Sequence, residues 1–197
     1  IVEMGKEYPE ILSAGMKLKE VSARVQDIIG SRFIHAENVV LGGFSKIPSK
    51  DKLERIKRDY EEVEKFAEIA TEILMNFEYP EYLDRERVHL AVKPHGDEYT
   101  VIGSYMETSR GDEFSPEDYR KFLKEKVVSH SFAKHVSLNG SRFMTGAISR
   151  YTLFKNLMVG KGRETAILKP LMLNPRNPFS NNFAQAIEIM YFIERSK

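Results

Sequence analysis

The chain has 197 residues, with 30 lysines and arginines against 29 acidic residues, a formal net charge of +1 and no cysteine. This balance provides no overall field to attract nucleic acid or an anionic membrane, and the lack of cysteine excludes disulfides, thiolate zinc sites and cysteine-ligated iron-sulfur clusters within the chain. No apolar run approaches the ~20 residues needed to span a bilayer, and no signal peptide precedes the first helix, so we expect a cytoplasmic protein without membrane insertion.

The two ends of the chain suggest a piece of a longer protein. The sequence begins with Ile1 instead of an initiator methionine, and it stops at Lys197 within a helical pattern. We therefore expect residues 1–197 to be a single piece of a larger protein, long enough to bury a core.

Two long helices are predicted before residue 80. Apolar residues recur at helical spacing over residues 8–29, with Pro9 suited to the first turn and Gly30 to the C-terminal cap. After a connector, Ser49 is placed to cap a second helix, which Pro80 ends. The apolar stripe of the second helix consists of Leu53, Ile56, Tyr60, Val63, Ala67, Ala70, Leu74 and Phe77.

The middle of the chain changes to a β pattern. Apolar and polar side chains alternate loosely over residues 88–92, and residues 99–105 are rich in β-branched and aromatic side chains. Residues 94–97 between them are typical of a turn, so we predict a hairpin. A helix then begins at Ser115, the cap, and Pro116, in the first turn. Its apolar positions are Tyr119, Phe122, Leu123 and Val127.

The last third of the chain is less regular. Residues 130–150 have no single pattern, and two short strands around the Asn139–Gly140 turn are one solution. Residues 160–180 contain two glycines and three prolines and predict a long irregular segment. A last helix begins near Asn182. The elements together predict a helix-dominated α+β fold, with two long helices, a C-terminal helix and a small antiparallel sheet.

The connector between the two long helices contains the strongest candidate site. Arg32 and His35 follow a helix end, and Gly42 and Gly43 form a pair that permits positive φ or close backbone approach. In one interpretation, Arg32 and His35 hydrogen-bond the last helix carbonyls, where the helix dipole favours positive charge. In the other, they belong to a binding surface, which their spacing alone does not establish.

The other histidines and glycines form no recognisable site. His89, His95, His130 and His135 lack the His-Glu-x-x-His pattern and carboxylates at matching ligand spacing. The Gly160–Arg163 run lacks the spacing of a phosphate-binding loop, and no serine lies in a nucleophile elbow. Taken alone, the residues predict no metal site, no nucleotide site and no active site.

Several separated runs of sequence, each weak alone, carry a resemblance to a known family. They are Ile28–His35 with Leu41–Phe44, His89–Pro94 with Gly96–Asp97, Val127–His135, Met144–Arg150, and Asn177–Asn182 with Ala184–Glu188. In this order and at about this spacing, the runs resemble the large subunit of nickel-iron hydrogenases. The resemblance is strongest to the cytoplasmic archaeal branch of sulfhydrogenase-like and cofactor-linked enzymes, and it is poor over residues 151–172.

The resemblance implies the hydrogenase large-subunit fold and, for the intact complex, the reversible oxidation of H2 to protons and electrons. In that family, a nickel-iron centre is held by four cysteines in two Cys-x-x-Cys motifs, one near each end of the subunit. This chain has no cysteine and matches only the central portion. We therefore expect residues 1–197 to be the central fragment of a large subunit, to hold no cofactor of its own and to be inactive alone.

The resemblance also gives the connector a role. His35 matches the histidine of the family's Gly-Arg-x-x-His segment, which lies near the small-subunit cluster closest to the active site, and Arg32 matches the arginine. It implies that Arg32, His35, Gly42 and Gly43 face an iron-sulfur small subunit, with further electron-transfer subunits as partners and no nucleic acid. The other matched runs, including His130, are expected to be scaffold.

Two alternatives belong to other classes of protein. One is a non-catalytic scaffold related to the quinone-site subunit of respiratory complex I, which shares this fold ancestry without the nickel cysteines. The other is a helical interaction module that exposes apolar surface to a protein partner. Cys-x-x-Cys motifs in the flanking parts of the parent gene would select the enzyme.

Overall fold

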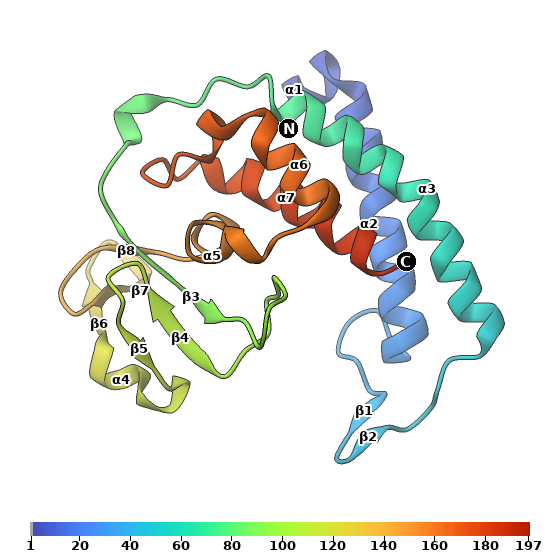
Figure 1. The fold of residues 1–197 in the computed structure, drawn as a ribbon, viewed down its shortest axis with the longest axis horizontal. Coiled ribbons are helices and arrows are strands. Elements are labelled where there is room, and N and C mark those ends of the chain that lie inside the picture. Colours follow the sequence, from blue (N-terminus) through green and yellow to red (C-terminus); the bar gives the residue numbers. More distant parts are fainter. Residues whose placement is uncertain (1) are drawn as a thin grey trace. The chain divides into compact units, whose positions relative to one another are not determined.

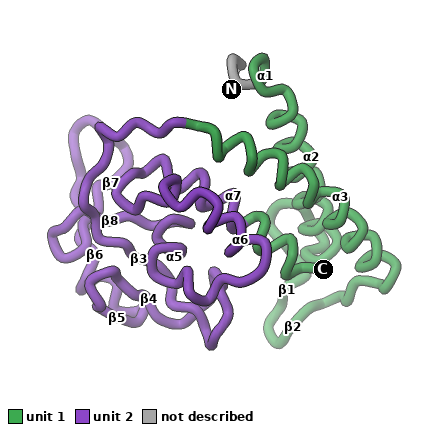
Figure 2. Tube along the Cα trace, turned by 45° about the horizontal axis from the view of Figure 1, so that its top comes forward, with its two compact units in different colours: residues 1–77, 189–197 green, residues 78–188 purple. Residues whose placement is uncertain are grey.

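The structure, a computed structural model, describes residues 2–197. Its internal contacts divide the chain into two compact units (Figure 2). Unit 1 consists of Ile1–Phe77 and Ile189–Lys197, and unit 2 of Glu78–Glu188. Helix α7 (Ser180–Arg195) begins in unit 2 and ends in unit 1.

Unit 1 is built on two long helices, α2 (Pro9–Gly30) and α3 (Lys50–Leu74), which pack side by side (Figure 1). A short helix, α1 (Val2–Glu7), precedes them. The connector between α2 and α3 carries a small antiparallel hairpin of β1 (Val39–Val40) and β2 (Gly43–Phe44).

The apolar stripes predicted for the two long helices do meet. Val21 of α2 and Val63 and Ala67 of α3 are buried together with Met190 and Ile193 of α7. Full burial of one valine- or leucine-sized side chain stabilises the folded state by about 1.5–3 kcal/mol. Burial of this cluster therefore stabilises unit 1.

The predicted C-terminal ends differ from the observed ones by one residue in α2 and by several residues in α3. Helix α2 includes Gly30, and the left-handed residue that caps it is Ser31, with φ of 61°. Gly30 serves close packing instead, since a Cβ there would lie 3.0 Å from the Cβ of Ala36. Helix α3 ends at Leu74, because the amides of Asn76 and Phe77 bond to carbonyls only three residues back and tighten the chain before Pro80.

Unit 2 contains a four-stranded sheet with the strand order β5-β4-β3-β8 (Figure 1). Its strands are β3 (Val88–Lys93), β4 (Tyr105–Thr108), β5 (Glu113–Phe114) and β8 (Phe143–Met144). Strand β3 pairs antiparallel with β4 and parallel with β8, so the sheet is mixed and not antiparallel throughout as predicted. A separate two-stranded sheet pairs β6 (Leu123–Val128) with β7 (Ser131–Leu138).

Short helices complete unit 2. They are the α-helices α4 (Tyr119–Phe122), α5 (Ala147–Phe154) and α6 (Gly160–Leu168), and the 3-10 helices η1 (Glu81–Leu83), η2 (Pro116–Asp118), η3 (Lys155–Leu157) and η4 (Pro170–Leu173). Helix α5 packs against β3. The predicted helix-dominated α+β class is confirmed. Among residues 2–197, no helix has the length and apolar character to cross a bilayer.

The strand predicted over residues 99–105 is wrong. The hairpin partner of β3 is β4, which begins at Tyr105, opposite Lys93. Residues 99–104 before it form no regular strand, and Tyr99 is buried. Gly103 passes so close to β3 that a Cβ would lie 1.8 Å from the carbonyl oxygen of Lys93. Tertiary contact, not β propensity, therefore decides this segment.

The helix predicted from Ser115 is shorter than expected. Ser115 does cap a helical turn, since its Oγ accepts a hydrogen bond from the amide of Glu117 at 3.3 Å. Helix α4 nevertheless ends at Phe122, and residues 123–127 belong to β6. The ring of Phe122 stacks on Phe114, with ring centroids 4.1 Å apart, and this packing fixes where the helix gives way to the strand.

The predictions for the last third of the chain are confirmed only in part. Asn139 and Gly140 do form a turn, with φ of 46° and 78°, but the strands on either side of it belong to different sheets. The irregular segment predicted at 160–180 is wrong over its first half, where residues 160–168 form α6 and bury Gly162 and Ala166. Beyond η4, residues 174–179 are irregular as predicted. The last helix is confirmed, two residues earlier than predicted.

Candidate functional site

The connector folds back on the end of α2. Ser31 and His35 both have left-handed φ, at 61° and 59°, and this lets the chain reverse its direction. The amides of Glu37 and Asn38 then donate to the carbonyl of Gly30, at 3.0 and 3.1 Å. The reversal is thus held by the helix end itself.

Asn38 organises the connector from inside, because its side chain is only 1% exposed. Its Nδ2 donates to the carbonyls of Ile29, at 2.7 Å, and Lys46, at 2.8 Å. Its Oδ1 accepts from the Ser45 hydroxyl, at 2.8 Å, and from the Lys46 amide, at 2.7 Å. Every hydrogen-bonding position of the amide is used, so Asn38 ties the end of α2 to the chain beyond β2.

Arg32 and His35 make no hydrogen bond to the end of α2, where connector amides bond the carbonyl of Gly30 and Asn38 bonds that of Ile29. Arg32 instead donates through Nη1 to Glu37 Oε1 at 2.7 Å, in an exposed ion pair of the kind that adds little to stability. The side chain of His35 is exposed. The capping interpretation is wrong, and the binding interpretation stays open.

A shallow groove of about 470 Å³ opens beside the end of α2. It is lined by Val25, Gln26, Ile29, Gly30, Arg32, Phe33, Ile34, His35, Ala36 and Val39. Most of this lining is apolar, and His35 is one of its few polar side chains. The groove can receive one or two side chains of a partner protein.

Gly42 and Gly43 shape the hairpin that projects from the connector. Leu41 and Gly42 form its turn, in which Gly42 has φ of 90°, and Gly43 follows with φ of 144°. A Cβ at either glycine would meet no atom within 4 Å. The pair therefore serves the shape of the backbone and leaves the space around it open.

Large apolar side chains are exposed along the connector. The exposed fractions of Ile47 and Val39 are 87% and 64%, and Leu41 at the turn is fully exposed. The whole set, here called the apolar surface of the connector, is Phe33, Ile34, Val39, Val40, Leu41, Phe44 and Ile47. Such a concentration is typical of a site for a protein partner.

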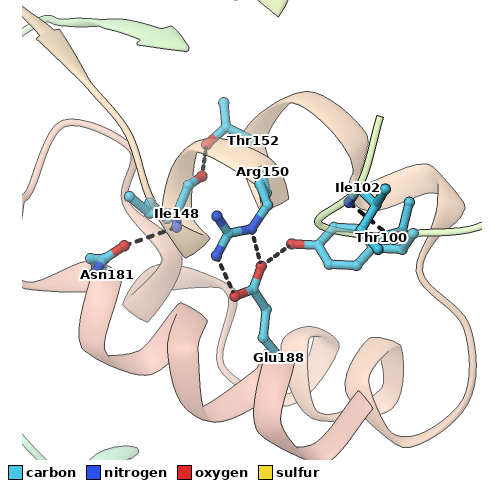
Figure 3. Close-up of polar contacts among 8 residues, drawn as sticks. Thr100, Ile102, Ile148, Arg150, Thr152, Asn181 and Glu188 are labelled. Carbon is cyan, nitrogen blue, oxygen red and sulfur yellow. Dashed lines mark hydrogen bonds and ion pairs between the residues drawn. The ribbon is translucent and has the colours of Figure 1, made fainter. Parts of the chain in front are cut away.

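A second polar cluster lies inside unit 2 (Figure 3). Glu188 accepts hydrogen bonds from Nε and Nη2 of Arg150 and from the hydroxyl of Tyr99, each at 2.7 Å. The hydrogen bond to Glu188 raises the pKa of Arg150, while burial is the main reason that the pKa of Tyr99 is raised. The charges of Arg150 and Glu188 are therefore satisfied within the fold.

His89 is a buried core histidine. Its Nδ1 lies 3.0 Å from Oγ of Ser149, which donates its own proton to the carbonyl of Met144 at 2.8 Å. Burial lowers the pKa of His89, and a hydrogen bond to the carbonyl of Pro175 opposes that shift. These bonds account for the histidine without a ligand.

The remaining histidines do not assemble a metal site. The rings of His130 and His135 meet edge to face, with centroids 5.4 Å apart, on the exposed β6–β7 hairpin. Over residues 2–197, no three or more histidine, aspartate or glutamate side chains converge as metal ligands would. His95 instead shares a hydrogen bond with Ser104, at 3.1 Å.

Sequence reasoning missed two residues that organise these regions. Asn38 lies directly before the apolar run Val39–Leu41, and an asparagine between predicted elements often bonds the backbone of a turn. Glu188 is an acidic residue within the apolar face of the last helix, between Ile187 and Met190, and such a position implies a buried partner. Its partners, however, are distant in sequence.

The chain is homologous to known hydrogenase subunits. It is 45% identical over 195 residues to the alpha subunit of sulfhydrogenase 1 from Pyrococcus furiosus, which covers 99% of this chain and 46% of the relative. It is 27% identical over 194 residues to the alpha subunit of sulfhydrogenase 2 from the same organism, with 98% and 44% covered. The chain thus spans about half the length of the curated relatives it matches. No family model matches it.

A solved structure has the same fold. The crystal structure of an NAD+-reducing [NiFe]-hydrogenase in the H2-reduced state matches with a TM-score of 0.80 and 16% identity, over 100% of this chain and 48% of that one. The chain therefore has the fold of part of a hydrogenase subunit. More particularly, it is a homologue of the sulfhydrogenase alpha subunit over about half of that subunit's length, which confirms the resemblance seen in the sequence.

Proposed function

We propose that this chain is the central part of the large subunit of a nickel-iron hydrogenase, whose intact complex reversibly oxidises H2 to protons and electrons. The observation that carries the proposal is the 45% identity to the alpha subunit of sulfhydrogenase 1 over 99% of the chain. The fold shared with an NAD+-reducing [NiFe]-hydrogenase supports it.

The residues of this chain do not fit a nickel-iron centre. Soft thiolates are the ligands suited to such a metal site, and the chain has no cysteine. Histidine and carboxylate side chains do not substitute for them, since they form no converging group in the part of the chain that the structure describes. In the proposal, cysteines elsewhere in the parent subunit hold the nickel-iron centre, and this chain provides scaffold without catalysing the reaction alone.

The connector is proposed to contact an iron-sulfur small subunit. The apolar surface of the connector, the groove beside α2 and the exposed ring of His35 support this role. His35 would donate a hydrogen bond toward a cluster in that partner and so tune its reduction potential. Arg32 would brace the loop through its ion pair with Glu37, while Gly42 and Gly43 keep the hairpin turn narrow.

The proposal also covers the source organism, the cellular location and the partner subunits. Both curated relatives come from Pyrococcus furiosus, which supports an archaeal source. A cytoplasmic location and further electron-transfer subunits belong to the same proposal.

The activity is tested on the full parent protein, expressed with its neighbouring subunits. We expect H2-dependent reduction of a viologen dye, and nickel that co-purifies in proportion to the alpha chain. A parent complex that binds neither nickel nor iron and does not oxidise H2 would overturn the proposal and favour the non-catalytic scaffold.

The connector is tested separately, with His35→Leu and His35→Gln in the same complex. Leucine removes the hydrogen-bond donor of the imidazole, so the reduction potential of one iron-sulfur cluster should shift in His35→Leu. Glutamine keeps a donor, so the potential in His35→Gln should lie closer to that of the native complex. His130→Gln, at an exposed histidine of unit 2, is the matched control. Equal potentials in all four proteins would exclude the role of His35 without affecting the proposed activity.

A further inference from the structure

The β6–β7 hairpin differs from the rest of the chain in charge. From Leu123 to Leu138, three lysines accompany one acidic residue, Glu125, which gives a net charge of +2. The whole chain carries +1, so the remaining residues carry −1. Positive charge is therefore concentrated on this hairpin.

The pairing of the strands separates the charges onto two faces. Lys126 pairs with His135 and Glu125 with Val136, and alternate residues of a strand point to opposite faces. Lys124, Lys126 and His135 consequently share one face, here called the lysine face. On the other face, Glu125 is ion-paired with Lys134 at 2.6 Å.

The lysine face points away from the fold. Leu123 and Leu138, which lie on the same face as Glu125, pack into the apolar cluster of the four-stranded sheet. Lys124, Lys126 and His135, on the opposite face, are all exposed. Because Glu125 is the only acidic residue of the hairpin and is already paired, no carboxylate of the hairpin balances the lysine face.

The hairpin also has open strand edges and an apolar end. In the described part of the chain, β6 and β7 form a sheet only with each other, and a single bridge from Leu138 to Ser141 covers one end of the β7 edge. The rest of each outer edge is open to a further strand. Phe132, near the hairpin turn, is fully exposed, and 76% of Val127 is exposed. A two-stranded hairpin with such an end is marginally stable in water alone.

We propose that the β6–β7 hairpin docks an acidic, extended segment of a partner protein. The segment adds as a further strand to a hairpin edge, with its carboxylates against Lys124 and Lys126 and its apolar residues over Val127 and Phe132. A polypeptide satisfies the charge, the open edge and the apolar end together. A nucleic acid neutralises the lysines but leaves the strand edge and the apolar residues uncovered.

Zero-length carbodiimide crosslinking of the native complex tests the proposal, because the reagent joins an amine only to a carboxylate in direct contact. Mass spectrometry should find Lys124 or Lys126 joined to aspartate or glutamate of another protein. The Lys134–Glu125 pair is an internal positive control. If the control forms while Lys124 and Lys126 remain unlinked, or link only to a second copy of this chain, the proposal is wrong.

Charge reversal provides the second test. The double variant Lys124→Glu, Lys126→Glu should lower the amount of the crosslinked partner that co-purifies at least tenfold. Lys57→Glu, Lys65→Glu makes the same charge change on exposed positions of α3 and should leave that amount unchanged. An equal loss of partner in both double variants would mean that net charge alone causes the effect. In a chemical acylation experiment, protection of Lys126 that disappears after nuclease treatment would identify a nucleic acid as the ligand. Either outcome overturns the proposal.

Discussion

The connector and the Glu188 cluster use polar side chains in opposite ways. In the connector, one buried amide, Asn38, fixes the backbone, while apolar side chains and His35 face outward. In the cluster, the charged groups of Glu188 and Arg150 face each other inside unit 2. The connector thus presents side chains that a partner can contact, whereas the cluster satisfies its charges within the fold.

The largest expected effect is that of Glu188→Ala. The variant leaves Arg150 and the Tyr99 hydroxyl without their acceptor, and breaking a buried pair in this way costs about 3–5 kcal/mol. Because Arg150 keeps 24% of its side chain exposed, we expect the lower end of that range. Urea-induced unfolding of the chain measures the loss of free energy.

A double variant, Arg150→Met with Glu188→Leu, is the control for this interpretation. It removes both charges at once and should restore most of the free energy of unfolding, because neither residue is left unpaired. A loss below about 1 kcal/mol in Glu188→Ala would mean that water replaces the cluster's hydrogen bonds, as for an exposed pair.

Asn38→Ala should have a smaller and more local effect. It leaves the carbonyls of Ile29 and Lys46 without a side-chain donor, and unsatisfied buried groups cost about 1–3 kcal/mol. We expect hydrogen exchange to accelerate over residues 31–49 and to change little in unit 2. Asn76→Ala, which removes an exposed amide bonded to Glu72, is the matched control and should leave this exchange unchanged.

The pH dependence of stability follows from His89. Because burial lowers the pKa of this histidine in the folded state, the unfolded chain binds more protons below its ordinary value of 6.5. Stability should be complete above that value and should decrease as the pH falls through the folded-state pKa, with a slope of at most about 1.4 kcal/mol per pH unit. Thermal unfolding between pH 5 and 8 measures the slope.

His89→Gln should flatten that profile, because glutamine does not titrate. His130→Gln, at an exposed position, should leave the profile as it is in the native chain. If both variants keep the full slope, other titrating groups cause the loss of stability in acid.

The sequence predicted the elements that depend on local periodicity. The stripes of α2, α3 and α7 have helical spacing, and the turn at Asn139 has its own residue signature. The prediction of a strand over residues 99–105 failed because β-branched residues also occur in irregular segments. The close approach of Gly103 to β3 decides the course of this segment. No local pattern reveals such a contact.

The candidate site was predictable to a similar extent. Arg32 and His35 could be located in the connector, but the exposed surface depends on Asn38, whose four hydrogen bonds reach seven to nine residues away. The Glu188 cluster joins residues 38 and 89 positions apart, and such pairs leave no trace in spacing.

The smallest effect on stability is expected for Leu41→Ser, at the fully exposed turn of the connector hairpin. Since the leucine buries little in the free chain, the free energy of unfolding should change by less than about 0.5 kcal/mol. Loss of an apolar anchor should nevertheless weaken binding of the small subunit about tenfold or more, since a side chain at the centre of an interface is worth over 1 kcal/mol. Ile102→Ser, at an exposed apolar residue of unit 2, controls for a general loss of hydrophobic surface and should leave binding unchanged. A Leu41 variant that binds normally would show that the hairpin lies outside the contact, whereas one that unfolds would show that Leu41 is part of the scaffold.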